Sequence, residues 1–276
     1  HPNARGFDDF YGHMHTEVGY FPPFANQGGI DFQRNGVTIT DEGYETFLLA
    51  DEASRWIKER DKEKPFFLYM PFIAPHSPLE APDDLVQKYK NLEDTRELTR
   101  STAIDRTRTL NGFSPSARPM YAAVVDGLDQ AIGQVLDTLA NEGIEEETII
   151  LFSSDNGGAA YAGGGADNFP LRGGKGDTYE GGIRAIAAMK WKGKLDAGKN
   201  FESIMTVMDV FPTLASASKV PMLNTKEIWG RDMWPAIKKG KDIKLNKEVY
   251  FVSETPNYGE FHTTVFNDKW KLVQVI

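Results

Sequence analysis

Residues 148–158 read TIILFSSDNGG and carry the clearest signal for the fold of this 276-residue chain. The first six letters, TIILFS, are almost wholly apolar, as expected of a strand that is buried on both faces. A second run of this kind occupies residues 66–73 and is followed by APHSP. Apolar residues recur at helical spacing over 43–60 and again from Met120 to Leu139. Strands that alternate with helices in this way predict an α/β sheet with helical cover.

The remaining pattern divides the chain near residue 243. Residues 91–117 have low hydrophobicity and no steady period, so we expect a loop there. We predict a main α/β domain over 1–243 and the start of a small antiparallel subdomain over 244–276. The further elements expected are a short helix from Pro82 to Tyr89, a glycine-rich loop over 157–182, a strand over 183–191, a helix over 203–217 whose second segment starts at Pro212, and antiparallel strands over 249–252, 262–266 and 270–275, the last two joined by a hairpin at Asn267-Asp268.

Composition excludes several classes of protein. The chain has no cysteine, which rules out a disulfide framework and a thiolate zinc site. No apolar run approaches the roughly 18 residues of a membrane-spanning helix. The first 183 residues are strongly acidic, which argues against a nucleic-acid partner. The last 93 residues carry a small positive excess, which suits either an anionic ligand or a solvated lysine-rich surface.

Polar residues follow both apolar runs. Asp155 and Asn156 offer a carboxylate and a carboxamide oxygen, the ligand type that Ca²⁺ and Mg²⁺ prefer. The alternative is an Asx-turn that closes the strand. His76 lies between Pro75 and Pro78, where it could donate a proton or bind an oxyanion, or could instead be a structural histidine. In open α/β sheets, ligands bind at the carboxyl ends of strands, where both motifs are expected.

Lys175 lies in the sequence RGGKG of residues 172–176. Glycines let the backbone approach a ligand closely, and the ammonium could then point at an anion; a solvated lysine in a surface loop is the alternative. The segment is not a P-loop, because Phe169 and Gly176 stand where that motif needs glycine and Ser or Thr. His13 and His15, with Glu17 nearby, lack the further ligand and known geometry of a zinc site and fit a pocket rim or surface better.

The order of the motifs is more specific than any one of them. The chain contains HPNARGFDDFYG, LYMPFIAPHSPLEAP, YAAVVDGLDQAIGQVLDTL, ILFSSDNGG, FPLRGGKGDTYEGGIR and MDVFPTL in that order. This combination resembles the type I sulfatases of the alkaline phosphatase superfamily, and the likeness to arylsulfatase B-type enzymes is closest across LRGGKGDTYEGGIR. The resemblance covers nearly the whole chain.

The resemblance implies an alkaline-phosphatase-like sheet with helices on both faces, and hydrolysis of sulfate esters on a saccharide or other small molecule. It implies Ca²⁺ and a formylglycine, made from Cys or Ser in a Cys/Ser-x-Pro-x-Arg motif, as the source of the nucleophile. Asp155 and Asn156 match the family's cation ligands. His76 and Lys175 match its sulfate contacts, either of which could stabilise or protonate the leaving oxygen. A periplasmic, extracellular or lysosomal location is also implied.

The family's formylglycine motif, its first Asp-Asp metal pair and its Gly-Lys-Trp-His segment precede RGFD, which here begins at Arg5. We therefore expect a truncated sulfatase that is inactive by itself. Ser114-Pro-Ser-Ala-Arg118 mimics the modification motif, but Ser116 replaces its proline, so we expect a loop there. A phosphodiesterase or phosphonate hydrolase of the same superfamily, and a non-catalytic glycan-binding relative, are the alternatives.

Overall fold

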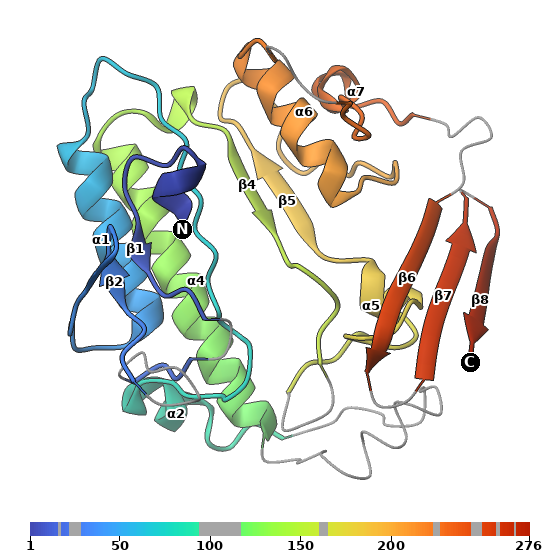
Figure 1. Cartoon of the computed structure of the whole chain (residues 1–276), viewed down its shortest axis with the longest axis horizontal. Coiled ribbons are helices and arrows are strands. Elements are labelled where there is room, and N and C mark those ends of the chain that lie inside the picture. Colours follow the sequence, from blue (N-terminus) through green and yellow to red (C-terminus); the bar gives the residue numbers. More distant parts are fainter. Residues whose placement is uncertain are drawn as a thin grey trace. The chain divides into compact units, whose positions relative to one another are not determined.

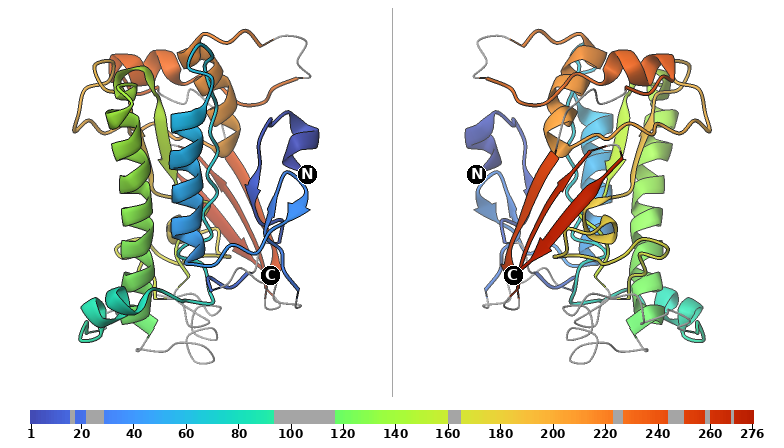
Figure 2. Two further views of the ribbon diagram at one scale, coloured as in Figure 1. Left: turned by 90° about the vertical axis from the view of Figure 1, so that its left-hand side faces the viewer. Right: turned by 90° about the vertical axis from the view of Figure 1, so that its right-hand side faces the viewer.

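The two helices with the clearest periodicity are α1 (Glu45–Glu59) and α4 (Ala117–Asn141) in the computed structural model, and they lie side by side (Figures 1 and 2). Between them, Thr138 donates a hydrogen bond to Ser54 (Oγ1 to Oγ 3.1 Å). Burial of apolar side chains stabilises the pair, with about 1.5–3 kcal/mol for each fully buried Val, Leu or Ile and less for each alanine. The buried apolar residues are Ala50, Ala53 and Ile57 of α1 and Ala117, Ala123, Val124, Ala131, Val135 and Leu139 of α4.

The structure describes residues 1–15, 18–21, 29–93, 117–159, 165–222, 227–243, 250–257, 260–267 and 269–276. The chain divides into two units. The first contains residues 1–145 and 154–186, and the second contains residues 146–153 and 187–276. The predicted boundary between 243 and 244 falls beside residues 244–249, outside the described part, and stays a prediction.

The first unit also contains the short elements η1 (Pro2–Arg5), α2 (Asp83–Tyr89) and α5 (Glu180–Ile183), and an antiparallel ribbon of β1 (Tyr11–Gly12), β2 (Gln33–Arg34) and β3 (Val37–Thr38). The helix predicted up to Tyr89 is confirmed as α2.

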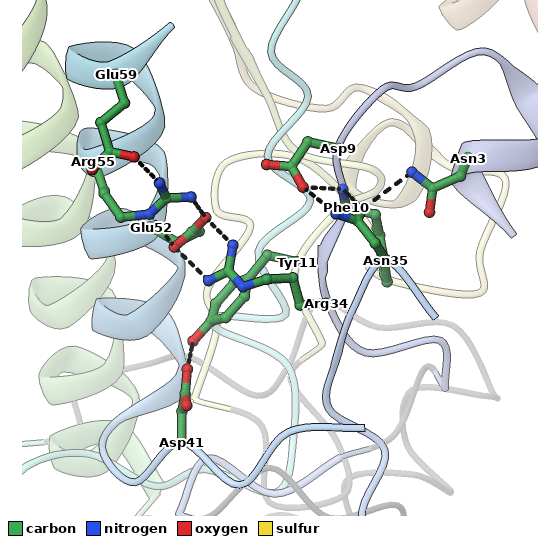
Figure 3. A network of polar contacts seen from close by, with 10 residues as sticks. All are labelled: Asn3, Asp9, Phe10, Tyr11, Arg34, Asn35, Asp41, Glu52, Arg55 and Glu59. Atoms are coloured by element: carbon green, nitrogen blue, oxygen red, sulfur yellow. Dashed lines mark hydrogen bonds and ion pairs between the residues drawn. The ribbon is translucent and has the colours of Figure 1, made fainter. Parts of the chain in front are cut away.

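Charged side chains tie this ribbon to α1 (Figure 3). Arg34 of β2 donates to Glu52 of α1 (Nη2 to Oε2 2.7 Å), and Arg55 donates to the same carboxylate (Nε to Oε2 3.0 Å). Burial would raise the pKa of Glu52, but the two guanidinium groups hold that pKa down at about 2. The Glu52 carboxylate, which stays ionised, thereby fastens β2 to α1.

The second unit contains three groups of elements. β4 (Ile150–Ser153) pairs antiparallel with β5 (Ala187–Lys190), so that Ile150 lies opposite Lys190. α6 (Val207–Ser218) begins with a capping box between Thr206 and Asp209, and it is followed by α7 (Trp234–Lys239). β6 (Tyr250–Asn257), β7 (Glu260–Phe266) and β8 (Lys271–Val275) form the predicted antiparallel sheet in sequence order.

Three expectations about secondary structure are wrong. Residues 66–73 are not a strand, because none of the described residues pairs with them; Phe67 and Tyr69 are about two-thirds exposed, at 66% and 65%. The strand expected over 183–191 is shortened to β5, since α5 extends to Ile183. Pro212 lies inside one continuous α6. Because Pro212 has no N–H, it cannot donate to the carbonyl of Met208. Gly230 packs against that carbonyl so closely that a Cβ at residue 230 would lie 1.9 Å from its oxygen.

The loop expected over 91–117 lies mostly outside the described residues, as do Ser114–Ser116 of the mimicked modification motif; Arg118 is in the first turn of α4. Asp268 of the predicted hairpin is also outside, although β7 and β8 pair as expected. Within the described ranges, none of the helices combines the length and apolarity needed to cross a bilayer.

Candidate active site

The structure brings together two of the predicted site residues. Lys175 and His76 are 99 residues apart in sequence, and Lys175 Nζ lies 2.9 Å from His76 Nε2. His76 Nδ1 lies 2.6 Å from the carbonyl oxygen of Ser77, which can only accept a hydrogen bond. We therefore assign the hydrogen of the neutral ring to Nδ1, so that Nε2 accepts from the lysine ammonium. The contact is exposed, and a ligand can reach it from solvent.

The backbone of His76 is held by the core of the first unit. The amide of His76 donates to the carbonyl of Ile73 (2.7 Å), and the buried hydroxyl of Tyr20 donates to the carbonyl of His76 (2.9 Å). Tyr20 is wholly buried, stacks on Tyr44 at 5.4 Å between ring centroids, and donates its own amide to Glu80 (2.7 Å). The apolar cluster therefore fixes the turn, while the imidazole itself projects into solvent.

Lys175 is held by the packing of one glycine-rich stretch on another. Its amide donates to the carbonyl of Gly158 (3.2 Å). A Cβ at Gly174 would lie 2.6 Å from that same carbonyl oxygen, so the two backbones approach as only glycine permits. The buried carboxylate of Asp177 accepts from the amide of Gly174 (3.0 Å), and the amide of Asp177 donates back to the carbonyl of Gly174 (2.9 Å). These bonds define the turn that presents the lysine.

Asp155 and Asn156 follow β4 directly, as predicted. Asp155 is exposed and Asn156 is half-buried. The carboxamide nitrogen of Asn156 donates to the carbonyl of Gly157 (3.0 Å), so its oxygen is the atom that could face a cation. Two residues later, the carbonyl of Gly158 accepts the Lys175 amide. The possible cation ligands are thus joined to the lysine loop by backbone hydrogen bonds.

The donor atoms at this position fit Ca²⁺ in kind but not in number. Carboxylate and carboxamide oxygens are the ligands that this hard cation prefers, and it takes six to eight of them. Within the described ranges, no group of three or more His, Cys, Asp or Glu side chains could hold a metal ion. Asp155 and Asn156 would therefore hold a small part of the coordination shell.

His13 and His15 have other roles in the structure. His13 Nε2 lies 3.3 Å from the buried carboxylate of Glu45, and its Nδ1 lies 2.7 Å from the carbonyl of His15. Burial alone would lower the pKa of His13, but the Glu45 carboxylate outweighs it, so the pKa lies above its usual value. Glu17 lies outside the described residues. His13 thus makes a structural contact to α1.

Two residues that hold the site, Asn168 and Asp177, are not among those predicted from the sequence. Asn168 hydrogen-bonds the backbone of Gly158 through both ends of its carboxamide, and Asp177 closes the turn around Lys175. A signal was present for each. Asn168 lies two residues before Pro170 in a turn-rich segment, and Asp177 directly follows the glycines of GGKG, where carboxylates often cap backbone amides.

Comparison with known proteins identifies the family. The Sulfatase family model matches residues 2–220. Arylsulfatase J of Mus musculus is 31% identical over 293 residues, covering 99% of this chain and 45% of that protein. N-acetylgalactosamine-6-sulfatase of Mus musculus is 28% identical and covers 91% of this chain and 45% of its own length. The chain thus spans a little under half the length of these curated relatives.

A solved structure extends the likeness to three dimensions. The crystal structure of Ps i-CgsB in complex with k-i-k-neocarrahexaose has a TM-score of 0.82 and 28% sequence identity; it covers 100% of this chain and 61% of the solved one. The chain belongs to the sulfatase family. The predicted fold class, an alkaline-phosphatase-like α/β domain, is confirmed by this likeness.

Proposed function

We propose that the full-length protein containing this chain hydrolyses sulfate esters, with His76 and Lys175 as its contacts to the sulfate group. The observation that carries the proposal is the 2.9 Å contact between Lys175 Nζ and His76 Nε2 at an exposed position. Two side chains from segments 99 residues apart meet where a tetrahedral anion could accept a hydrogen bond from the lysine ammonium, and also from His76 Nε2 once that atom is protonated. Membership of the sulfatase family supports sulfate as that anion.

Lys175 supplies a fixed positive charge. When the ester bond breaks, negative charge moves from the sulfate group onto the departing oxygen, and a preorganised cation stabilises that charge more than it stabilises the ground state. The turn around Lys175 is held by the hydrogen bond from the Lys175 amide to the carbonyl of Gly158 and by the two hydrogen bonds between Gly174 and Asp177. The turn that carries the ammonium therefore needs little reorganisation as the charge develops.

His76 handles a proton. In the assigned tautomer, Nδ1–H donates to the carbonyl of Ser77 and Nε2 carries the lone pair. Once Nε2 is protonated, the same atom becomes a donor that can protonate the leaving alcohol. Lys175 keeps its own proton and its charge, and solvent, which reaches the exposed imidazole, supplies the proton to Nε2. The pair can therefore stabilise the leaving oxygen by charge and also by proton transfer.

Asp155 and Asn156 would contribute two oxygen ligands to a Ca²⁺ ion. In the family resemblance, Ca²⁺ and a formylglycine supply polarisation of the sulfate and the nucleophile. The role of this chain's own residues is to orient the ester between the cation ligands and the His76–Lys175 pair. The hydrogen bond from Lys175 to Gly158 links the two sides.

A sulfated saccharide is the substrate class that the comparisons favour. Ps i-CgsB was solved in complex with k-i-k-neocarrahexaose, and N-acetylgalactosamine-6-sulfatase is named for a sulfated amino sugar. A saccharide alcohol is a poor leaving group, so its departure needs proton donation of the kind that His76 can provide.

The test compares sulfate, phosphate and phosphonate esters that share one aryl leaving group on the full-length protein. We expect the highest kcat/KM for the sulfate, and release of inorganic sulfate from sulfated oligosaccharides. A higher kcat/KM for the phosphodiester or phosphonate would replace the proposal with the alternative of a phosphodiesterase or phosphonate hydrolase. Binding of the oligosaccharide without turnover of any ester would indicate a glycan-binding relative.

A further inference from the structure

Asn168 holds both backbone polar groups of Gly158, the residue that connects the possible cation ligands to Lys175. The amide of Gly158 donates to Asn168 Oδ1 (2.9 Å), and Asn168 Nδ2 donates to the carbonyl of Gly158 (2.8 Å). The carboxamide therefore satisfies both the donor and the acceptor of one glycine. A side chain needs an acceptor and a donor on separate atoms at fixed spacing to do this, and the planar amide of Asn or Gln provides them.

The carbonyl of Gly158 serves two partners. It accepts from Asn168 Nδ2 and also from the amide of Lys175 (3.2 Å). A carbonyl oxygen has two lone pairs, so both bonds can form together. Asn156, two residues earlier, and Lys175 are therefore connected through a single oxygen atom whose position Asn168 fixes.

The space around this oxygen is tightly filled. A Cβ at Gly174 would lie 2.9 Å from Asn168 Nδ2, and a Cβ at Gly158 would lie 2.3 Å from the Cβ of Ala166. Real Cβ atoms do not approach neighbours so closely. Asn168 is half-buried, so little room exists for Gly158 to move while the carboxamide is in place.

We propose that Asn168 is a positioning residue: it fixes the Asp155–Gly158 segment relative to Lys175 so that both can act on the same sulfate group. The catalytic part of this inference rests on the proposed function. A purely structural asparagine would make the same bonds, and its loss would lower stability without changing how Lys175 acts. Hydrogen exchange tests whether Asn168 fixes the loop, and a double-mutant cycle tests whether it acts through Lys175.

The first test uses this chain and measures no activity. Asn168→Asp keeps the size and the Oδ1 acceptor, but it removes the Nδ2 donor and places a second oxygen against the carbonyl of Gly158. We expect hydrogen exchange at the amides of Gly158 and Lys175 to become about tenfold faster, as expected for the loss of one hydrogen bond. Exchange within α4 should not change. Unchanged exchange at Gly158 and Lys175 would overturn the inference.

The matched control is Asp167→Asn at the neighbouring exposed position. Its Oδ1 accepts from the amide of Phe169 (2.9 Å), and an asparagine there can make the same bond. This variant should leave exchange at both amides as in the wild type. If Asn168→Asp does not fold, Asn168→Ser provides a smaller change that also removes the two-ended hydrogen bond.

The second test is a double-mutant cycle on turnover of a sulfate ester by the full-length protein. We expect Asn168→Asp to lower kcat at least tenfold with little change in KM, and to lower it less than twofold when Lys175 is already alanine. Additive losses would mean that Asn168 does not act through Lys175 and would overturn the inference. If the wild-type protein turns over no sulfate ester, the proposed function fails, while the exchange measurement still decides whether Asn168 fixes the loop.

Discussion

Replacement of His76 by alanine should separate proton transfer from binding in the proposed reaction. The imidazole is exposed, and the two hydrogen bonds that hold its turn are made by the backbone of residue 76. His76→Ala should therefore change the free energy of unfolding by no more than about 0.5 kcal/mol, as is usual for surface substitutions. Ser77→Ala, also at an exposed position, keeps the carbonyl that accepts from Nδ1 and is the matched control.

The expected loss depends on the leaving group. General acid catalysis contributes about 10²–10⁴-fold, so kcat/KM of the full-length protein for a sugar sulfate should fall about 100-fold or more in His76→Ala. An activated aryl sulfate releases a stable phenolate that needs little protonation, and its kcat/KM should fall less than about tenfold. The assay measures both substrates for the wild type, His76→Ala and Ser77→Ala. Equal losses on both substrates would refute the assignment of His76 as the proton donor and leave it a binding role.

Four other predictions follow from the same structure. In the full-length protein, Lys175→Ala should lower turnover because it removes about 3–4 kcal/mol of transition-state stabilisation, the scale of a lost charge-stabilising group. Full retained turnover would show that this loop is not at the sulfate site. The 276-residue chain alone, which contains no Cys/Ser-x-Pro-x-Arg motif, should release no product from an aryl sulfate above the uncatalysed rate, because it lacks the nucleophile. Calorimetry should find weak or no Ca²⁺ binding to this chain, since two oxygen ligands leave most of the shell to water; sub-micromolar affinity lost on Asp155→Ala would contradict this. The raised pKa of His13 means that the Glu45 contact stabilises the fold fully below the unfolded-state value of about 6.5 and loses this effect as pH rises through the folded-state value. Denaturant unfolding at a series of pH values should therefore show this decline in the wild type and not in His13→Gln, and the same profile in both would disprove it.

The helices of the first unit could be predicted from the sequence because their signal is local. Periodicity of the apolar residues places α1 and α4, while Pro82 and the acids Asp83 and Asp84 in the first turn indicate where α2 begins. The segment 66–73 could not be predicted in this way. Its apolar residues favour a buried strand, but a strand forms only through hydrogen bonds to a neighbouring strand, and the apolar pattern does not identify that neighbour.

At the site, too, residues within one motif could be predicted from the sequence, whereas contacts between distant segments could not. The residues His76, Lys175, Asp155 and Asn156 were identified from motif order, and each motif alone fits an ordinary turn or surface position. The contact between His76 and Lys175 depends on how two segments 99 residues apart pack, which no spacing rule gives. Asn168 was missed because an asparagine near a proline is common in turns, and its partner, a glycine backbone, has no side chain to leave a pattern in the sequence.

The glycine stretches restrict how this protein can change during evolution. At Gly157 a Cβ would lie 1.6 Å from the carbonyl oxygen of Gly181, and at Gly174 it would lie 2.6 Å from that of Gly158. Because these contacts are between backbone atoms, no side-chain substitution can change their geometry in small steps. In a deep mutational scan, these positions should reject every substitution, while exposed neighbours such as Arg172 accept many. New substrate preferences would then have to arise at residues around this segment, with the segment itself inherited unchanged.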